Sequence, residues 1–289
     1  MANGILVIDK PRDWTSHDVV AKLRGILRER RIGHAGTLDP MATGVLPVFV
    51  GRATRAVEFA SEREKEYIAG LRLGTVTDTQ DVTGTILDTH PVTVTRDRLE
   101  AALDRFRGEI LQIPPMYSAI KKQGKKLYEL ARRGVEVERE PRPITIYELE
   151  LLEQVSGTDW TLRVLCSKGT YVRTLCHDIG QALGCGGTLY ALRRTRSAGF
   201  GLDQAMTLEQ VAETKDPASL LLPVDTCFAR YPVLTLTEEE DERKVRNGNQ
   251  IFLDGVDGAY RVYGPGGAFL ALSRLEQGRL VTIKSFFEV

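Results

Sequence analysis

A run of glycines and prolines from Gly33 to Pro47 is the feature that most limits how this chain can fold. Neither a helix nor a strand continues through the run, because turn-forming residues interrupt it at Gly33, Gly36, Pro40 and Gly44. The segment carries one imidazole, His34, and one carboxylate, Asp39. An irregular loop between regular elements is a common way to present a reactive group. The alternative interpretation is a turn in which Asp39 caps backbone amides.

The order of residues in this run resembles the catalytic-aspartate motif of the TruB family, the bacterial tRNA pseudouridine synthases. The matching residues are Gly-His-Ala-Gly-Thr-Leu-Asp-Pro, from Gly33, and Thr-Gly-Val-Leu-Pro, from Thr43. Members of this family isomerise uridine 55 in the T loop of tRNA. The resemblance implies that Asp39 is the nucleophile and that His34 fills the gap left in the RNA by the flipped nucleotide. Without the resemblance, His34 can instead bond its own loop backbone.

Two further segments resemble the parts of the family's site that hold the target base. Residues 65–73 alternate in polarity, which predicts a strand with Tyr67 on its apolar face. Lys65 and Tyr67 match the family's Lys-x-Tyr, in which the tyrosine stacks on the uracil. Leu192 belongs to a Leu-Arg-Arg motif whose leucine packs on the same base. From the residues alone, Tyr67 and Leu192 are also consistent with ordinary core side chains.

Arg173 lies in the first turn of a helix that we predict from Thr170 to Leu183, before Gly184. A cation at this position is unfavourable against the helix dipole, so we expect an anion nearby. The segment Gly-Thr-Tyr-Val-Arg matches the family's arginine motif, and the resemblance implies that the anion is Asp39. A bidentate contact from Arg173 would orient the carboxylate and offset the cost of its charge in a buried pocket.

Two basic features are expected to contact RNA. Lys10 follows an apolar strand at residues 5–8, and its Lys-Pro pair belongs to the family's first motif. It can hold a phosphate, support the active-site loop or end a strand at the surface. Residues 119–143 fall where bacterial members carry an RNA-gripping insertion, after a Pro-Pro-x-Tyr-Ser-Ala-x-Lys motif. Their short helix would order on the phosphate backbone, or is an ordinary solvated helix. The basic residues assigned here to RNA binding are Lys121, Lys122, Lys125, Lys126, Arg132 and Arg133.

The charge of the chain is compatible with an RNA partner only if it is segregated. There are 39 basic and 39 acidic residues among 289, and the basic ones gather at 119–143 while 238–242 is acidic. The four cysteines lack Cys-x-x-Cys spacing, which argues against a zinc site and fits a reducing compartment. No apolar run approaches the ~20 residues that span a bilayer, and the N-terminus lacks a signal-like stretch. We therefore expect a cytoplasmic protein without membrane association.

We expect an α+β protein, with the pseudouridine synthase fold that the resemblance implies: a mixed, largely antiparallel sheet flanked by helices. The catalytic domain is expected over residues 1–228, with a linker region around 212–229. Short strands separated by turns in residues 229–289 resemble, more loosely, the small PUA-like β-barrel of bacterial members. This domain either contacts RNA or is purely structural. Pro47 predicts that the strand at 45–50 is an edge strand or carries a bulge.

Three other functions are open at this level. Asp78, Asp81 and Asp88 would be the magnesium ligands of a nuclease, but no His or Glu cluster completes such a site, and the turn chemistry of a polar hairpin is the stronger explanation. A non-catalytic tRNA-binding or folding protein would keep Tyr67 and the basic segment without needing both Asp39 and Arg173. A guide-RNA-dependent relative would share the aspartate motif. The resemblance implies no cofactor, no metal, no obligate protein partner and a monomer.

Overall fold

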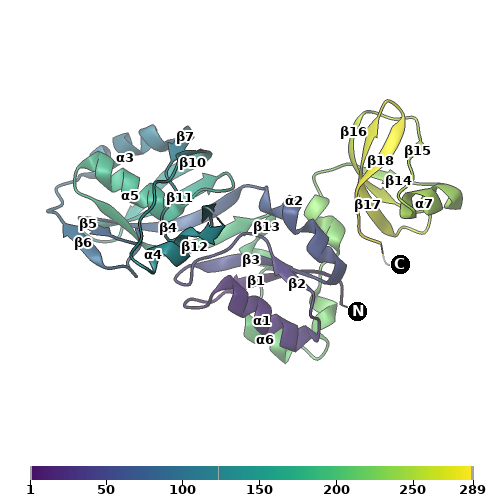
Figure 1. Ribbon diagram of the computed structural model, residues 1–289, viewed down its shortest axis with the longest axis horizontal. Coiled ribbons are helices and arrows are strands. Elements are labelled where there is room, and N and C mark those ends of the chain that lie inside the picture. Colours follow the sequence, from purple (N-terminus) through teal and green to yellow (C-terminus); the bar gives the residue numbers. More distant parts are fainter. Residues whose placement is uncertain (1, 123, 288–289) are drawn as a thin grey trace.

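The computed structural model describes residues 2–122 and 124–287. The strands of its main sheet are β1 (Gly4–Lys10), β2 (Ile32–His34), β3 (Thr43–Val50), β4 (Lys65–Leu73), β7 (Gly108–Gln112), β10 (Arg142–Gln154), β11 (Asp159–Cys166), β12 (Gly187–Ser197) and β13 (Phe200–Gly201). They form a nine-stranded sheet in the order β1-β3-β12-β4-β11-β10-β7, with β2 beside β3 and β13 beside β12 (Figure 1). Only β3 and β12 pair in parallel among these described strands. The predicted α+β class with a largely antiparallel mixed sheet is confirmed.

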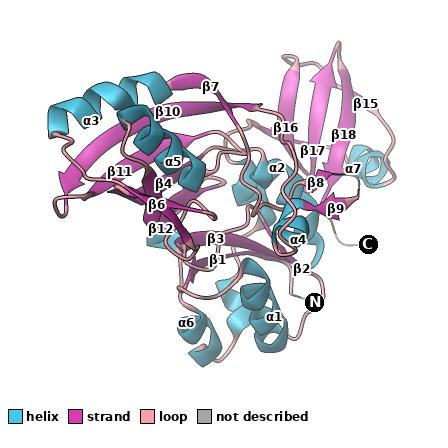
Figure 2. Cartoon of the chain, turned by 60° about the vertical axis from the view of Figure 1, so that its left-hand side comes forward, coloured by secondary structure: helices cyan, strands magenta, loops and turns pink. Residues whose placement is uncertain are grey.

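Helices cover both ends of this sheet (Figure 2). The α-helices are α1 (Ser16–Leu27), α2 (Val57–Ser61), α3 (Arg96–Leu103), α5 (Val172–Leu183) and α6 (Leu208–Glu213). Short 3-10 helices are η1 (Gly51–Ala56), η2 (Asp104–Phe106) and η3 (Leu202–Gln204). Residues of α3 and α5 share one core cluster with β4, β10, β11 and β12. Residues of α1 and α6 share another with β1 and β3.

Strands β1 and β4 have the burial that their sequences predict. In β1, Ile5 and Val7 enter one core cluster while Leu6 and Ile8 enter another. Burial on both faces explains why this strand is a continuous apolar run. In β4, every second residue from Tyr67 to Leu73 packs into the cluster beneath α5. Tyr67 therefore lies on the apolar face, as predicted.

Strand β3 lies inside the sheet and pairs with β1 without a register shift, so the prediction of an edge strand or a bulge is wrong. Pro47 is paired with Val7 of β1 and sits where the other neighbour of β3 changes from β12 to β2. At this point the carbonyl of Pro47 accepts a hydrogen bond from the N–H of Ala35 at 3.0 Å. On this side of β3, β12 pairs only with Thr43 and Gly44, and β2 pairs only with residues 48–50. Pro47 lies between these two pairings, so its missing N–H removes no hydrogen bond of the sheet.

Two hairpins lie outside the main sheet. The first pairs β5 (Thr75–Thr77) with β6 (Ile86–Thr89), and a bridge between Asp81 and Leu189 holds its loop against β12. The second pairs β8 (Lys121–Lys122) with β9 (Lys125–Lys126) and leads into α4 (Leu127–Ala131), the predicted short helix of the insertion. The N–H of Tyr128 in α4 donates to the carbonyl of Ser118 at 3.1 Å, which ties the insertion to the preceding segment.

The region predicted as a linker is a packed part of the main body. After α6 it forms η4 (Pro217–Leu220) and η5 (Val224–Phe228). Between them Leu222 exchanges two backbone hydrogen bonds of 2.8 Å with Ile5, so this stretch lies along the outer edge of β1. Apolar side chains of this region complete the clusters around β1 and β3.

The C-terminal residues form a second sheet at the end of the molecule opposite α3 (Figure 1). Its strands, β14 (Val233–Thr235), β15 (Ile251–Phe252), β16 (Gly258–Tyr263), β17 (Phe269–Glu276) and β18 (Arg279–Ser285), have the order β14-β16-β17-β18-β15. The acidic run at residues 238–242 leads into α7 (Glu239–Arg246). The sheet is curled like half of a barrel and packs on the main body through Phe228, whose ring contacts Phe269 and Phe286. The domain boundary after residue 228 stays a prediction.

Candidate active site

The middle of the Gly-Pro run, residues 35–42, forms the loop between β2 and β3, and this loop is anchored on both sides of Asp39. Ser16 at the start of α1 accepts a hydrogen bond through Oγ from the N–H of Leu38 at 2.9 Å. The carbonyl of Pro40 accepts bonds from the ammonium of Lys10 at 3.2 Å and from the N–H of Asp13 at 2.8 Å. Asp39 is therefore held in place by its two chain neighbours, and its own side chain is left free to face a cleft.

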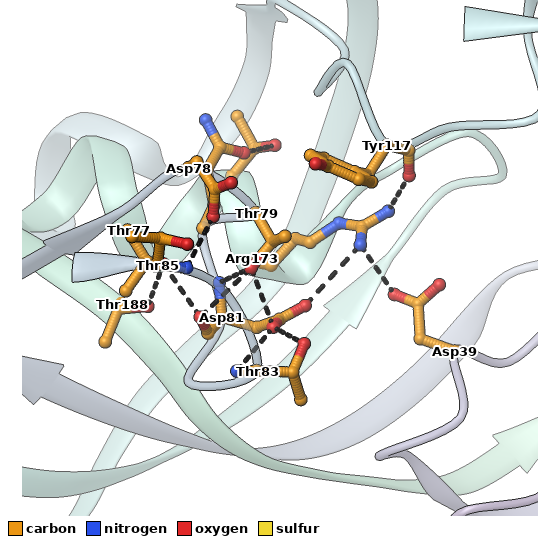
Figure 3. Close-up of polar contacts among 12 residues, drawn as sticks. Asp39, Thr77, Asp78, Thr79, Asp81, Thr83, Thr85, Tyr117, Arg173 and Thr188 are labelled. Carbon is orange, nitrogen blue, oxygen red and sulfur yellow. Dashed lines mark hydrogen bonds and ion pairs between the residues drawn. The ribbon is translucent and has the colours of Figure 1, made fainter. Parts of the chain in front are cut away.

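Arg173 meets Asp39 across this cleft, as predicted. Helix α5 begins at Val172, two residues later than predicted, and places Arg173 in its first turn with a side chain only 7% exposed. Nη1 of Arg173 lies 3.3 Å from Oδ2 of Asp39. The predicted bidentate contact is wrong, because Nη1 is shared with a second carboxylate, Asp81 at 3.6 Å, and Nη2 donates to the carbonyl of Tyr117 (Figure 3).

Asp81 is the residue that sequence reasoning assigned to turn chemistry alone. Its side chain is 5% exposed, and its Oδ1 accepts hydrogen bonds from Thr79 Oγ1 and from the N–H of Thr83, both at 2.9 Å. These local bonds are the predicted turn chemistry, and they leave Oδ2 facing Arg173 (Figure 3). The hairpin thus supplies the site with a second acid. Among the described residues no group of three or more His, Cys, Asp or Glu is arranged to hold a metal ion.

The ionised form of Asp39 is disfavoured, because Asp39 shares the guanidinium of Arg173 with a second carboxylate, Asp81. Burial raises the pKa of the Asp39 carboxyl above its ordinary value, the charge of Arg173 opposes that rise, and the charge of Asp81 adds to it. The arginine therefore offsets only part of the cost that burial imposes. A carboxylate in this state is a stronger base and nucleophile than a solvated one when it is ionised.

The cleft in front of Asp39 encloses about 860 Å³, enough for a nucleotide. Tyr67 from β4 and Leu192 from β12 line it beside Asp39, and Arg173 closes another wall. Tyr67 is buried, which raises the pKa of its phenol to about 12, so the hydroxyl is protonated at neutral pH. The structure thus brings together an acid, its counter-ion and two side chains suited to holding a flat base.

Lys10 and Lys65 are buried cations. Lys10 is 0% exposed and its ammonium donates to the carbonyls of Pro11, Trp14 and Pro40, so the expectation that it contacts substrate is contradicted; it supports the loop instead. Lys65 donates to the carbonyls of Ser61 and Arg63 and lines the cleft. Burial lowers the pKa of each lysine to about 8.

His34 ends β2 and is half-buried, with its ring edge-on to that of His17 at 5.6 Å between centroids. Burial and the charges of His17 and Arg194 lower the pKa of His34 to about 4, so its imidazole is neutral at pH 7. His17 lines the cleft, whereas His34 is not among the described residues that line it. A neutral ring beside His17 is compatible with the wedge role, which stays a prediction.

The insertion contributes a second wall of the cleft. Lys126 and Arg132 line it together with Tyr128, whose ring lies between the two cations at 5.3 and 5.4 Å. The remaining predicted RNA-binding residues lie on the outside of the insertion as exposed side chains: Lys121, Lys122, Lys125 and Arg133. Arg194 on β12 also lines the cleft; the Leu-Arg-Arg motif contained it, but only the leucine had been given a role.

Comparison with known proteins relates this fold and site to a family. The model described as "TruB family pseudouridylate synthase (N terminal domain)" matches residues 24–172, and "tRNA pseudouridylate synthase B C-terminal domain" matches residues 173–229. A relative from Azoarcus sp. (strain BH72), named tRNA pseudouridine synthase B, is 45% identical over 97% of this chain and 93% of its own. One from Syntrophomonas wolfei with the same name is 46% identical over 94% and 93%.

Solved structures of related proteins have a similar fold over nearly the whole chain. A protein in the structure titled "Crystal Structure of a Cbf5-Nop10-Gar1 Complex" is 27% identical, with a TM-score of 0.75 over 98% of this chain and 85% of that one. One in "Structure of H/ACA RNP bound to a substrate RNA containing 2'-deoxyuridine" is 25% identical, with a TM-score of 0.73 over 99% and 85%. The fold is that of a pseudouridylate synthase. Within that class, the chain belongs to the TruB family.

Proposed function

We propose that this protein isomerises uridine 55 in the T loop of tRNA to pseudouridine. The relatives named tRNA pseudouridine synthase B support tRNA as the substrate. The single observation that carries the chemistry is the ion pair of 3.3 Å between Asp39 and Arg173 at the bottom of a nucleotide-sized cleft. A protein that only bound or folded tRNA would have no need of a carboxylate held there against the cost of burial.

In this proposal Asp39 is the nucleophile and Arg173 its counter-ion. The glycosidic bond between N1 and C1′ breaks, the uracil turns, and C5 is joined to C1′. Leaving the stacked loop costs the target nucleotide a few kcal/mol. Stacking on Tyr67, worth about 1–3 kcal/mol, offsets part of that cost, while Leu192 packs on the same base.

The insertion grips the RNA in this proposal. Lys126 and Arg132 face the cleft, and the exposed cations Lys121, Lys122, Lys125 and Arg133 would meet the phosphate backbone around it. His34 fills the gap that the flipped nucleotide leaves; the variant His34→Ala is expected to weaken RNA binding. We further propose a monomer that acts in the cytoplasm without cofactor or obligate protein partner. No helix among the described residues is long and apolar enough to cross a membrane.

The test is incubation with unmodified tRNA in the presence of a metal chelator, followed by mapping of pseudouridine at base resolution. We expect modification at position 55 by the wild-type protein and none by Asp39→Asn, with unchanged RNA binding by that variant. A matched control is Asp88→Asn, since Asp88 pairs with His90 on the outside of the hairpin. Pseudouridine formation by Asp39→Asn would refute the assignment of the nucleophile, and tRNA binding without modification by the wild-type protein would favour the non-catalytic alternative.

A further inference from the structure

Four arginines lie close together where α1 ends and β2 begins. They are Arg24, Arg28, Arg30 and Arg31, and all four are exposed. None of them forms an ion pair with an acidic side chain in the part of the chain that the structure describes. The one acid between them, Glu29, accepts a hydrogen bond through Oε1 from the N–H of Arg31 at 2.9 Å. These four residues, called the arginine cluster below, concentrate positive charge at one place on the surface.

The arginine cluster lies on the side of α1 that borders the cleft. His17, in the first turn of α1, lines the cleft and its ring contacts that of His34. Arg24 and Arg28 follow His17 by close to two and three helical turns, so they return to the same face of the helix. At about 1.5 Å per residue, they lie roughly 10 and 16 Å from His17 along the helix axis. The cluster therefore continues a surface that begins at the cleft.

The same face of α1 carries small side chains among these larger ones. Ala21 and Gly25 are both exposed, and a Cβ added to Gly25 would have no atom within 4 Å of it among the described residues. Glycine destabilises a helix interior relative to alanine, and no packing contact described here requires one at this position. A face of small side chains allows the backbone of a ligand to come close to the helix and to the arginines beside it.

Two of the arginines are held at the start of β2. Nε of Arg31 donates to Oγ1 of Thr54 at 2.8 Å, which fixes the side chain and leaves its two terminal nitrogens available. Nη2 of Arg24 donates to the carbonyl of Ile32 at 3.5 Å. Arg31 precedes His34 by three residues of extended chain, which is about 10 Å. The helix and the strand thus place the arginine cluster at a similar distance from the two histidines.

We propose that the arginine cluster binds the phosphate backbone of the RNA stem that carries the target loop. This inference rests on the proposed function, which puts the flipped nucleotide in the cleft and His34 in the gap that it leaves. A duplex advances about 3 Å per base pair, so the cluster lies level with roughly the third to the fifth base pair of the stem, counted from the loop. Guanidinium groups match phosphate oxygens in charge and geometry. Such contacts position the stem whatever its sequence.

The test measures how the affinity for a T stem-loop depends on salt, for the wild-type protein and for Arg28→Gln and Arg30→Gln, separately and combined. The stem is either normal or carries neutral methylphosphonates at its third to fifth base pairs. On the normal stem we expect the combined variant to bind at least about tenfold more weakly at about 0.1 M salt, and the slope of log affinity against log salt to fall by about 1 per arginine. On the neutral stem the loss should be below about threefold, because the phosphates that the arginines bind are no longer charged.

The matched control is Arg105→Gln, an exposed arginine of η2 at the other end of the main sheet, which should change neither affinity nor slope. An equal loss on the two stems would overturn the inference, because the arginines would then act without these phosphates. Unchanged affinity and slope on the normal stem would overturn it as well. If the combined variant does not fold, the slopes of the two single variants decide. Wild-type protein that binds the stem-loop without forming pseudouridine, or does not bind it, would refute the proposed function itself, which separates the two failures.

Discussion

Replacing Arg173 by methionine tests whether the guanidinium keeps Asp39 charged. At 3.3 Å, two opposite unit charges attract by about 5 kcal/mol at an effective dielectric constant near 20. The side chain of Asp39 is 38% exposed, so solvent screening reduces this to about 2–3 kcal/mol. Since about 1.4 kcal/mol is a factor of ten, Arg173→Met should lower single-turnover pseudouridine formation at pH 7 by roughly 30- to 150-fold.

The loss of activity in Arg173→Met should depend on pH in a definite direction. The charge of Arg173 lowers the pKa of Asp39, against the effects of burial and of Asp81. Without the guanidinium that pKa rises further, so the acid limb of the pH–rate profile moves to higher pH. The loss should be largest in acid and should shrink as the pH rises.

The control for this experiment is Arg163→Met. Arg163 pairs with Glu66, Glu148 and Glu150 outside the cleft, so its replacement disturbs a comparable ionic cluster without touching Asp39. It should leave the profile unchanged. A profile for Arg173→Met that is lowered uniformly, with no shift of its acid limb, would refute the reasoning.

Three further perturbations test other parts of the structure. Tyr67→Phe should keep RNA affinity within about threefold and lose turnover, whereas Tyr67→Leu should lose both; equal losses would point to the hydroxyl alone. Burial lowers the pKa of Lys10 from 10.5 to about 8, so the unfolded chain binds more protons between these values and stability rises with pH. Lys10→Met lacks this rise, so its deficit in unfolding free energy should grow from pH 8 to 10; parallel curves would contradict it. Phe228→Ala should cost about 3–5 kcal/mol in urea unfolding, because its ring joins the two sheets; a cost below 1 kcal/mol would mean that they pack independently.

The sequence predicted well those features that depend on neighbouring residues. The alternation in β4 placed Tyr67 on the apolar face. The unfavourable position of Arg173 against its helix dipole correctly indicated an anion nearby. In each case the period of a strand or the chemistry of a helix end decides the outcome.

Features that depend on distant contacts were beyond such reasoning. Asp81 has the sequence signature of a turn, and only the docking of its loop on β12 buries it beside Arg173. That second acid also explains the failure of the bidentate prediction. Pro47 indicated an edge strand because nothing local reveals where one neighbouring strand replaces another. For Lys10 the sequence left phosphate binding, support of the loop and a surface position open, and only the three carbonyls around its ammonium decide for support of the loop.

The two buried arginines of the cleft, Arg173 and Arg194, have different electrostatic surroundings, which suit different roles under the proposed function. Arg173 is held between two carboxylates, so its charge is already compensated before substrate enters, and its effect is to control when Asp39 is ionised. Arg194 donates to two backbone carbonyls and interacts with the Tyr67 hydroxyl, so its charge is stabilised by polar groups and not by a carboxylate. An acid with its counter-ion suits the sugar carbon, which becomes electron-poor, and a cation without a carboxylate partner suits the uracil, which becomes electron-rich. Exchanging the two settings would stabilise the reactants instead of the separated charges, so the asymmetry itself favours breaking the glycosidic bond.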